Sequence, residues 1–380
     1  MFELTKRWVR EGHKVTVVTA PYEKSDIVAR GFVDEQFFEG IKVKVIDSKD
    51  SNRYSFARRA INALKFSAVS SWFAICLDYE VIVCSSGPLS VGLPGIISSK
   101  LRGKKFVFEV RDLWPAGAIE MKKITSQWQI KLALWFEKVC YKSASLVVTA
   151  SPDQQAHIAN RFPLLKTMVI PNASDIDVFG ADTSSEKLPE WTNNKHIFTY
   201  IGSLGFIHNC KLIIESAIHL QGANDKILIV LIGDGDERNE LEEMANTYQL
   251  KNVFFLGKLP KMRLPLWVQN SKATLFTTLN NPVQNSSSPN KVFDSLAAGT
   301  PVIQTTEGWL SGLITDEKCG LNVLPDNARA LANAMIKIVS NPILQKELSS
   351  NASRVANTFF NRDKLAEKYL SALKNLMTSN

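Results

Sequence analysis

Short runs of apolar residues alternate with segments of helical spacing along most of the chain. Most of the runs are continuous rather than strictly alternating with polar residues, as in parallel strands that are covered on both faces. Ten runs predict strands, over residues 14–20, 41–47, 80–86, 104–110, 144–150, 196–202, 226–233, 252–257, 273–278 and 301–305. Alternation of strands and helices in two series predicts an α/β protein with two doubly wound domains.

A polar segment rich in turn residues, 172–195, separates the two series and is expected to be a linker. We therefore expect an N-terminal domain over residues 1–171 and a second domain over residues 196–355. The remaining segment, 356–380, contains an amphipathic stretch at 363–377 and is expected to pack back toward the first domain as a helix. Ligands of such domains bind beyond the carboxyl ends of the strands.

In the second domain, a serine-rich loop leads into a short helical pattern, SSSPNKVFDSLAAGTPVI, at 286–303. Ser288 suits an N-cap, Pro289 suits the first helical position, and Gly299 suits the position after the C-terminus. A helix N-terminus offers unpaired N–H groups and a partial positive charge. Because a lysine is unfavourable in a first turn, Lys291 indicates that an anion such as a phosphate binds here.

Composition narrows the class of protein. The 380 residues are 45% hydrophobic and 22% charged, which is typical of globular domains. No apolar run reaches the roughly 18 residues of a membrane span, and the N-terminus lacks a signal-peptide layout. The five cysteines are scattered without CxxC spacing, which disfavours structural zinc and a disulfide framework and favours a reducing cytoplasm.

The net charge of +8 is concentrated in the first half of the chain. Residues 1–180 hold 25 Lys and Arg against 18 Asp and Glu, whereas residues 181–380 hold 20 against 19. The excess of positive charge in residues 1–180 favours an anionic partner. Because the sequence contains no nucleic-acid-binding motif, we expect this partner to be an anionic membrane surface and not a nucleic acid. The stretch 53–73 is typical of an interfacial helix, with Arg53, Arg58, Arg59, Lys65, Phe56, Phe66, Trp72 and Phe73. A helix whose aromatic residues face the domain's own core is the alternative.

Seven short segments, each common in other proteins, together form a distinctive pattern because of the order in which they occur along the chain. They are REGHKVTVVT (10–19), FEVRDLWPAG (108–117), SASLVVTASPDQQAHI (143–158), VIPNASDIDVF (169–179), YIGSLG (200–205), LIGDGDER (231–238) and SPNKVFDSLAAGTPVI (288–303). The chain resembles the retaining GT-B glycosyltransferases of glycosyltransferase family 4 over nearly all of its length. The RDLWP and SPNK segments resemble the fucosamine-transferase-like branch that builds bacterial O-antigen or capsule units on a lipid carrier.

The resemblance implies two Rossmann-like domains that face each other across a cleft, with the nucleotide-sugar donor in the second and the acceptor in the first. Asp294 falls on the second of the family's two acidic residues and would bind the ribose hydroxyls. The first falls on Ser286, so a serine hydroxyl or a backbone N–H is expected to replace the missing carboxylate. The implied donor-binding residues are Gly202, Ser203, Gly205, His208, Arg238, Ser286, Ser287, Ser288, Pro289, Asn290 and Asp294.

A further departure from the family's pattern and one match to it assign the catalytic roles. Ser203 and His208 stand where family members carry Arg and Lys, so Lys291 is expected to bind the diphosphate instead. Arg111 and Asp112 match the family's His-Asp pair near the transferred sugar, and with Lys291 they are the expected catalytic residues. A strand-ending turn with a buried tryptophan is the alternative interpretation of RDLWP.

The family's first strand precedes the segment that begins this sequence. A missing central strand would leave backbone groups unpaired, so we hypothesise that the native chain starts upstream of Met1.

The resemblance implies retaining transfer of a sugar, expected to be an N-acetylated amino sugar, from a UDP-sugar to a lipid-pyrophosphate-linked acceptor. The enzyme is expected to lie peripherally on the cytoplasmic face of the cell membrane. No cofactor or metal is expected, because DGD (234–236) and DID (175–177) lie in a turn and a linker and the histidines are dispersed. A nucleotide-sugar 2-epimerase and a catalytically degenerate transferase that acts as a binding partner are the alternatives.

Overall fold

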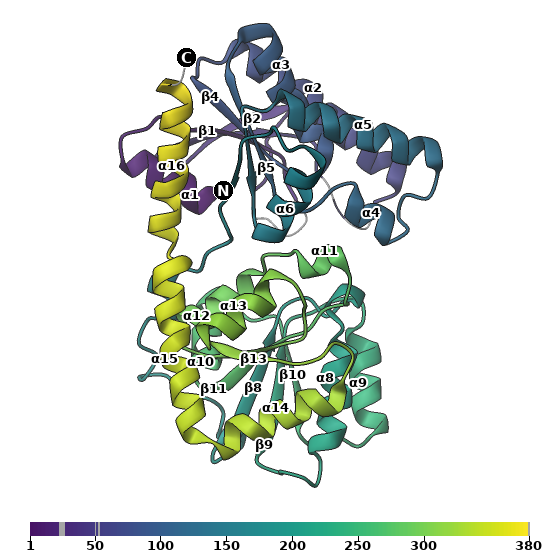
Figure 1. Cartoon of the computed structure of the whole chain (residues 1–380), viewed down its shortest axis with the longest axis vertical. Helices are drawn as coiled ribbons and strands as arrows, with labels where there is room; N and C mark the ends of the chain where they lie inside the picture. Colours follow the sequence, from purple (N-terminus) through teal and green to yellow (C-terminus); the bar gives the residue numbers. More distant parts are fainter. Residues whose placement is uncertain (23–26, 50, 52–53, 379–380) are drawn as a thin grey trace. The chain divides into compact units, whose positions relative to one another are not determined.

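The computed structural model describes residues 1–22, 27–49, 51 and 54–378, without the side chain of Phe56 (Figure 1). The chain divides into two compact units. Residues 1–171 together with 363–380 make the first unit, and residues 172–362 make the second. Both are α/β units with largely parallel sheets, which confirms the predicted fold class.

Two sheets form the first unit. A three-stranded sheet has the order β1 (Thr16–Thr19), β3 (Ile41–Ile46), β2 (Val33–Phe38), and a four-stranded parallel sheet has the order β4 (Val81–Ser85), β5 (Lys105–Val110), β6 (Leu146–Thr149), β7 (Thr167–Val169). β1 and β3 are parallel, and β2 is antiparallel to β3. Among the described residues, no strand joins β1 to β4. A chain start upstream of Met1 stays a prediction.

Helices cover the strands of the first unit. They are α1 (Phe2–Arg10), α2 (Phe56–Cys76), α3 (Gly92–Arg102), α4 (Ala116–Glu120), α5 (Gln127–Ser143), α6 (Pro152–Arg161) and α16 (Arg362–Thr378), with a 3-10 turn at Leu89–Val91. α3 packs against both α2 and α5. α1 and α16 lie together on another side of the unit (Figure 1).

The pairing of α1 with α16 has a specific aromatic contact. Trp8 of α1 is buried and donates a 3.0 Å hydrogen bond from Nε1 to the Ala366 carbonyl. Its ring meets the buried ring of Tyr369 edge-on at 5.3 Å between centroids. The C-terminal helix is therefore part of the core of the first unit.

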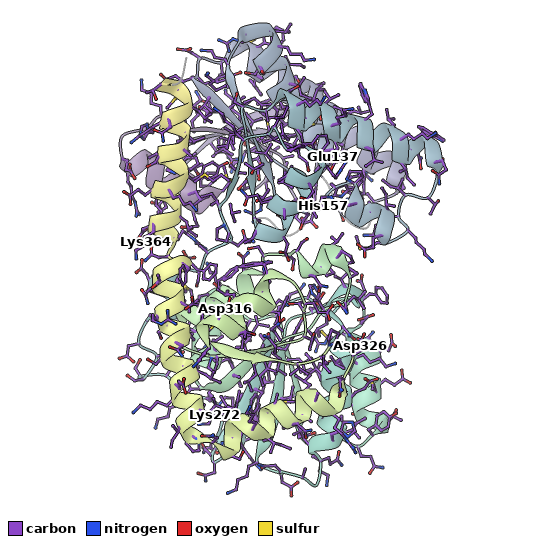
Figure 2. All side chains as sticks on the ribbon, in the orientation of Figure 1. Glu137, His157, Lys272, Asp316, Asp326 and Lys364 are labelled. Carbon is purple, nitrogen blue, oxygen red and sulfur yellow. The ribbon has the colours of Figure 1, made fainter. Side chains whose placement is uncertain are left out.

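An ion pair joins α5 to α6. Arg161 donates two hydrogen bonds, of 3.0 and 2.6 Å, to the carboxylate of Glu137, whose side chain is buried. Glu137 and His157 are labelled in Figure 2, and the Arg161 guanidinium lies 3.4 Å from the His157 ring. This pair fixes which side of α5 faces the interior.

One six-stranded parallel sheet organises the second unit. Its order is β10 (Val253–Gly257), β9 (Ile227–Ile232), β8 (His196–Ile201), β11 (Ser271–Phe276), β12 (Val302–Gln304), β13 (Gly320–Asn322). Every residue of β9 is buried, as the continuous apolar run predicts for a strand covered on both faces.

Two helical layers cover this sheet. The helices of the unit are α7 (Ile176–Phe179), α8 (Cys210–Leu220), α9 (Arg238–Thr247), α10 (Leu264–Gln269), α11 (Pro282–Asn285), α12 (Asn290–Ala297), α13 (Trp309–Glu317), α14 (Ala328–Ser340) and α15 (Pro342–Phe359). Three 3-10 turns lie at Glu190–Thr192, Phe206–His208 and Lys261–Arg263. α8, α9 and α14 share one apolar core with the sheet, and α7, α12, α13 and α15 share the other.

The segment 172–195, expected to be a linker, packs on the second unit. Phe179 is buried in the core beside α12, and Gln269 donates hydrogen bonds to the carbonyls of Phe179 and Ala181. No helix in the described part of the chain is long and apolar enough to cross a bilayer.

Candidate functional site

Two glycine turns meet at the carboxyl ends of β8 and β9. Gly202 has φ +147° and donates its N–H to the Ile232 carbonyl at 2.9 Å. A Cβ on Gly233 would lie 1.8 Å from the Gly202 carbonyl oxygen, and one on Gly235 would lie 2.2 Å from the Leu204 carbonyl oxygen. The close backbone approach of the two turns therefore requires Gly233 and Gly235.

Gly205 lies in the same turn, but the fold does not require it to be glycine. Its backbone is extended, with φ −141°, and a Cβ would touch only the Ser203 hydroxyl, at 3.8 Å. This glycine leaves an open surface of backbone at the carboxyl end of β8.

The side chain of Lys291 reaches back from α12 to this turn. Its Nζ donates a 3.0 Å hydrogen bond to the Tyr200 hydroxyl, which donates in turn to the Ser203 carbonyl at 2.8 Å. The ammonium also lies over the rings of Tyr200 and Phe276, at 4.3 and 5.7 Å from their centroids. A Cβ on Gly202 would fall 2.5 Å from Lys291 Nζ, so the glycine makes room for the lysine.

Burial among these rings lowers the pKa of Lys291 to about 8. Burial also raises the pKa of the Tyr200 hydroxyl. The structure thus brings together Gly202, Ser203 and Lys291, which the sequence placed in one site, and adds Tyr200, which it did not.

α12 begins one residue later than the sequence predicts. Its first residue is Asn290 and Pro289 is the N-cap, without a capping side chain, so Ser288 as N-cap and Pro289 as first helical residue were wrong. The reason is a long-range contact. The Ser288 hydroxyl accepts the backbone N–H of Asn172 at 3.1 Å, and the Asn172 amide donates to the Ser288 carbonyl at 2.6 Å.

The other two serines of the loop have different surroundings. Ser286 is buried and donates its hydroxyl to the Val283 carbonyl at 2.8 Å, at the end of α11. The Ser287 carbonyl accepts the indole N–H of Trp309 at 2.8 Å. Its hydroxyl has no partner among the described residues, so Ser287 is the serine whose hydroxyl is available to a ligand.

Asp294 lies one turn further along α12 and is mostly enclosed by protein. Burial raises the pKa of its carboxyl to about 6, against the opposing effects of the Ser174 hydroxyl and the Lys261 and Arg362 cations. Both cations pair with Asp175, Lys261 at 2.7 Å. Residues 172–175 thus brace the serine loop and the first turns of α12.

The predicted residues Ser203, His208 and Arg238 lie around the two glycine turns. Ser203 is exposed and His208 is half-buried in the 3-10 turn after Gly205, where its carbonyl accepts the Thr277 hydroxyl at 2.7 Å. Arg238 begins α9, and its guanidinium pairs with Glu242 at 2.8 Å and lies 3.9 Å from Asp234. The positive charge of Arg238 is therefore largely balanced by acidic residues of its own helix and of the turn before it.

The first unit holds the other two predicted residues, directly after β5. Two side chains hold the backbone of Arg111 in place. The Ser86 hydroxyl accepts the Arg111 backbone N–H at 3.0 Å, and the Gln154 amide donates to the Arg111 carbonyl at 3.1 Å. Asp112 is exposed as a residue, but partial burial of its carboxyl group raises the pKa of that group, and the neighbouring Arg111 charge opposes this effect. Beneath them, Glu109 is buried with Oε1 3.7 Å from the Arg111 guanidinium.

Sequence reasoning missed Tyr200, Ser174 and Glu109. Tyr200 and Glu109 lie in strands that read as apolar runs, each two residues before a predicted site residue. A residue with a polar side-chain group near the carboxyl end of an apolar strand is the sequence signal that could have identified Tyr200 and Glu109. Ser174 has no local signal, because it meets α12 only in the folded chain.

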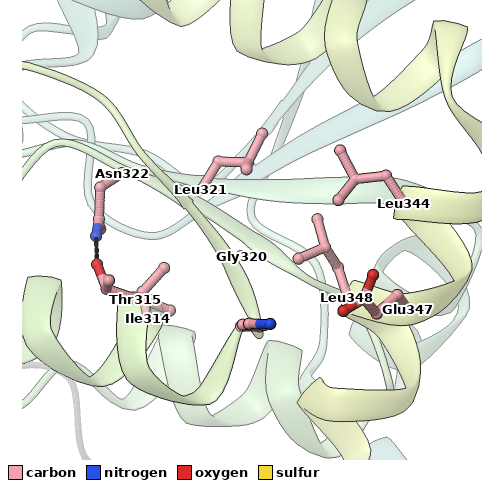
Figure 3. Close-up of a pocket in the computed structure, with 9 residues that line it drawn as sticks. Ile314, Thr315, Gly320, Leu321, Asn322, Leu344, Glu347 and Leu348 are labelled. Carbon is pink, nitrogen blue, oxygen red and sulfur yellow. Dashed lines mark hydrogen bonds between the residues drawn. The ribbon is translucent and has the colours of Figure 1, made fainter.

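One groove in the second unit lies away from these residues. A groove of about 280 Å³ runs between α13, β13 and α15, and aliphatic residues such as Leu321, Leu344 and Leu348 line it (Figure 3). It contains none of the predicted site residues. Among the described residues, no three His, Cys, Asp or Glu side chains gather as metal ligands would.

Two family models match the chain, one in each part. Residues 1–173 match the glycosyl transferase 4-like domain, and residues 183–355 match glycosyl transferases group 1. Among curated proteins, an uncharacterised glycosyltransferase of Methanocaldococcus jannaschii is 20% identical over 307 residues, which are 79% of this chain and 76% of that protein. The lipopolysaccharide core biosynthesis glycosyltransferase LpsE of Rhizobium meliloti is 26% identical over 42% of this chain and 44% of its own length.

Solved structures share the fold. Sucrose-phosphate synthase from Thermosynechococcus elongatus has a TM-score of 0.76 at 19% identity, covering 100% of this chain and 92% of that one. HepE of Anabaena, solved in complex with UDP, has a TM-score of 0.65 at 18% identity, covering 89% and 87%. With both family models matched and the fold shared, the chain is a GT-B glycosyltransferase made of a glycosyl transferase 4-like domain and a group 1 domain.

Proposed function

We propose that this glycosyltransferase moves a sugar, an N-acetylated amino sugar, from a UDP-sugar to a lipid-pyrophosphate-linked acceptor, with retention of anomeric configuration. Two comparisons support the donor and the pathway class. HepE was solved with UDP, and LpsE is named for lipopolysaccharide core biosynthesis. Assembly of surface polysaccharide on a lipid carrier follows from the resemblance of the RDLWP and SPNK segments.

The observation that carries the donor site is the position of the Lys291 ammonium over Gly202. Lys291 belongs to the first turn of α12, and its ammonium lies at the carboxyl end of β8, beside Gly202. The backbone N–H groups of Asn290 and Lys291 come before the first intrahelical hydrogen bond of α12. A cation beside a helix N-terminus and the bare backbone of Gly205 suits a diphosphate. Asp294, in the next turn of α12, is assigned to the ribose hydroxyls.

In the proposed reaction, the bond between the anomeric carbon and the β-phosphate oxygen breaks while the acceptor hydroxyl oxygen bonds to that carbon from the same face. The hydroxyl proton passes to the departing phosphate oxygen, so no protein nucleophile is required. Lys291 and the α12 N–H groups stabilise the charge that grows on the leaving diphosphate. Arg111 and Asp112 are assigned to the acceptor or the transferred sugar.

The acceptor carries a lipid, so we place the enzyme at the cytoplasmic face of the cell membrane as a peripheral protein. The excess of Lys and Arg in residues 1–180 supports contact with anionic lipid. The described cysteines form no disulfide, which supports a reducing compartment.

A thermal-shift panel with UDP, GDP, ADP, UMP and NAD tests the donor assignment. A ligand at 100 times its Kd stabilises a protein by about 2.7 kcal/mol, which is readily measured. The proposal predicts the largest rise of Tm with UDP, unchanged by EDTA. A rise with NAD alone would reject the UDP-sugar donor. If no nucleotide raises the Tm, the UDP-sugar donor is rejected and the non-catalytic alternative is favoured. Epimerised sugar formed from a UDP-sugar without acceptor would favour the epimerase.

A further inference from the structure

One face of α5 exposes large apolar side chains in a regular row. Trp128, Leu132 and Trp135 are 65%, 54% and 59% exposed. Their spacing of four and three residues places them on the same side of the helix. Monomeric domains expose single apolar residues routinely, but a row with two tryptophans on one helix indicates a surface that is covered by a partner.

The opposite side of α5 holds the helix in place. Cys140 and Tyr141 are buried in the core of the first unit, and buried Glu137 forms the two hydrogen bonds with Arg161 of α6. The helix cannot rotate to bury its tryptophans without breaking this ion pair. The exposed row is therefore a fixed feature of the fold.

The charges on this face are of one sign. Lys131, Lys138 and Lys142 are exposed among the apolar residues and pair with no acid in the described part of the chain. From residue 121 to residue 143 the sequence holds five lysines and one acid, Glu137, which is buried. A neutral or basic protein surface would leave these charges uncompensated.

We propose that the exposed face of α5 docks on an anionic lipid bilayer, with the tryptophans at the level of the headgroups and the lysines on the lipid phosphates. Tryptophan is favoured at this depth because its ring is apolar and its N–H is polar. Lysine suits the same place because its stem lies along apolar surface while the ammonium reaches the phosphates. The inference rests on the proposed lipid-linked acceptor, which requires the enzyme to work at a membrane.

The sequence placed the interfacial helix elsewhere, at residues 53–73. Of that stretch, Arg53 and the side chain of Phe56 lie outside the described residues. α2 does expose Ile61, Leu64 and Trp72, at 65%, 68% and 64%.

Two of the three basic residues of α2 already have partners within the unit and therefore suit lipid phosphates less well than the lysines of α5. Arg58 lies over the Tyr54 ring at 4.0 Å, and Lys65 lies 3.6 Å from Asp47. α5 carries its lysines along the apolar row itself, so we assign the first contact to α5. Both helices pack on α3.

Vesicle flotation of the full chain, without donor or acceptor, tests the assignment. The vesicles contain phosphatidylcholine alone or a mixture with phosphatidylglycerol. We expect binding to the anionic vesicles only, weakened about 10-fold or more in Trp128→Ala/Trp135→Ala. We expect a loss of about 100-fold in Lys131→Gln/Lys138→Gln/Lys142→Gln, with salt weakening the wild type in the same way.

Matched controls lie elsewhere on the chain. Leu164→Ala/Ile343→Ala removes two apolar residues that are 98% and 82% exposed, and it should bind like the wild type. Lys187→Gln/Lys251→Gln/Lys346→Gln changes the net charge equally, by exposed lysines of the second unit, and should also bind normally. Circular dichroism confirms that each variant is folded.

Several outcomes would overturn the proposal. Normal vesicle binding by both α5 variants would overturn it. Loss of vesicle binding in Leu64→Ala/Trp72→Ala alone would also overturn it, because the contact would then lie on α2. Self-association of the wild type that the tryptophan variant abolishes would show that a second copy covers the face. Because flotation needs no nucleotide, its failure leaves UDP binding and the proposed transfer untouched, and failure of UDP binding leaves the docking result intact.

Discussion

Lys291 and Gly202 depend on each other: the lysine ammonium occupies the space in which a side chain on residue 202 would begin, 2.5 Å from the ideal Cβ position. The two residues lie on different elements, one in the first turn of α12 and the other directly after β8. Their contact positions a single cation over the turn at the carboxyl end of the strand, where sheets of this type bind ligands.

Alanine substitutions at the two glycines of this turn should have different effects. Gly202→Ala should displace Lys291 and, because φ is +147° there, lower both UDP affinity and Tm. Gly205→Ala has an extended backbone and open space around the Cβ, so it should fold as stably as the wild type. If the diphosphate rests on this backbone, Gly205→Ala should still weaken UDP binding. Calorimetric titration and thermal unfolding of both variants separate the two effects, and unchanged UDP binding in Gly205→Ala would remove that residue from the site.

Replacing Lys291 should affect turnover more than acceptor binding. Loss of one group that stabilises the charge of a leaving oxyanion lowers kcat by about 10²–10³-fold. We expect Lys291→Ala to show this loss at saturating donor, with little change in the acceptor KM. Lys211→Ala, an exposed lysine on α8, is the matched control and should keep normal kcat. An equal kcat in both variants would contradict the assigned role.

UDP binding should have two pH limits. Burial raises the pKa of Asp294 to about 6 and lowers the pKa of Lys291 to about 8, and the proposed site needs both groups charged. Affinity should therefore fall below about pH 6, as Asp294 takes up a proton, and above about pH 8, as Lys291 loses one. Asp294→Asn should remove the acid limit and keep the alkaline one in titrations across this range. An acid limit that persists in Asp294→Asn would have to come from another group.

The same substitution should raise stability at neutral pH. The pKa of Asp294 is higher in the folded chain than in the unfolded one, so its ionisation between these values weakens the folded state. Asp294→Asn removes that ionisation. Its Tm should exceed the wild-type Tm at pH 7 and approach it at acid pH, where both side chains are neutral.

The strands were predictable, because buried parallel strands are read from local composition. All ten predicted strands are present. Those that the sequence missed are β2, β7 and β13, which are short or lie at sheet edges. In β2, half-exposed VDEQFF carries charges that hide the strand pattern.

The details of the site were less predictable, because they depend on residues far apart in the sequence. Ser288 looks like an N-cap until Asn172 engages its hydroxyl. Tyr200 reads as a core residue of a strand, and its role follows only from the approach of Lys291. In the same way, α5 is apolar on most of its circumference, so only packing reveals that Trp128 and Trp135 remain outside.

The contact between α1 and α16 should be a major source of stability for the first unit. Trp8→Ala removes a buried ring, the hydrogen bond to Ala366 and the edge contact with Tyr369. Truncation of a buried aromatic residue costs about 3–5 kcal/mol. Urea unfolding should show a loss in this range, and a loss within the error of the method would mean that α16 is not held by this residue.

The most direct test of the central claim compares UDP with uridine on the wild type and on Lys291→Ala by calorimetric titration. If Lys291 binds the diphosphate, UDP should bind the wild type far more tightly than uridine does, and the variant should lose most of that difference while its affinity for uridine stays the same. If UDP keeps its advantage in the variant, or if both ligands weaken equally, Lys291 does not hold the diphosphate and the donor site must be assigned to other residues.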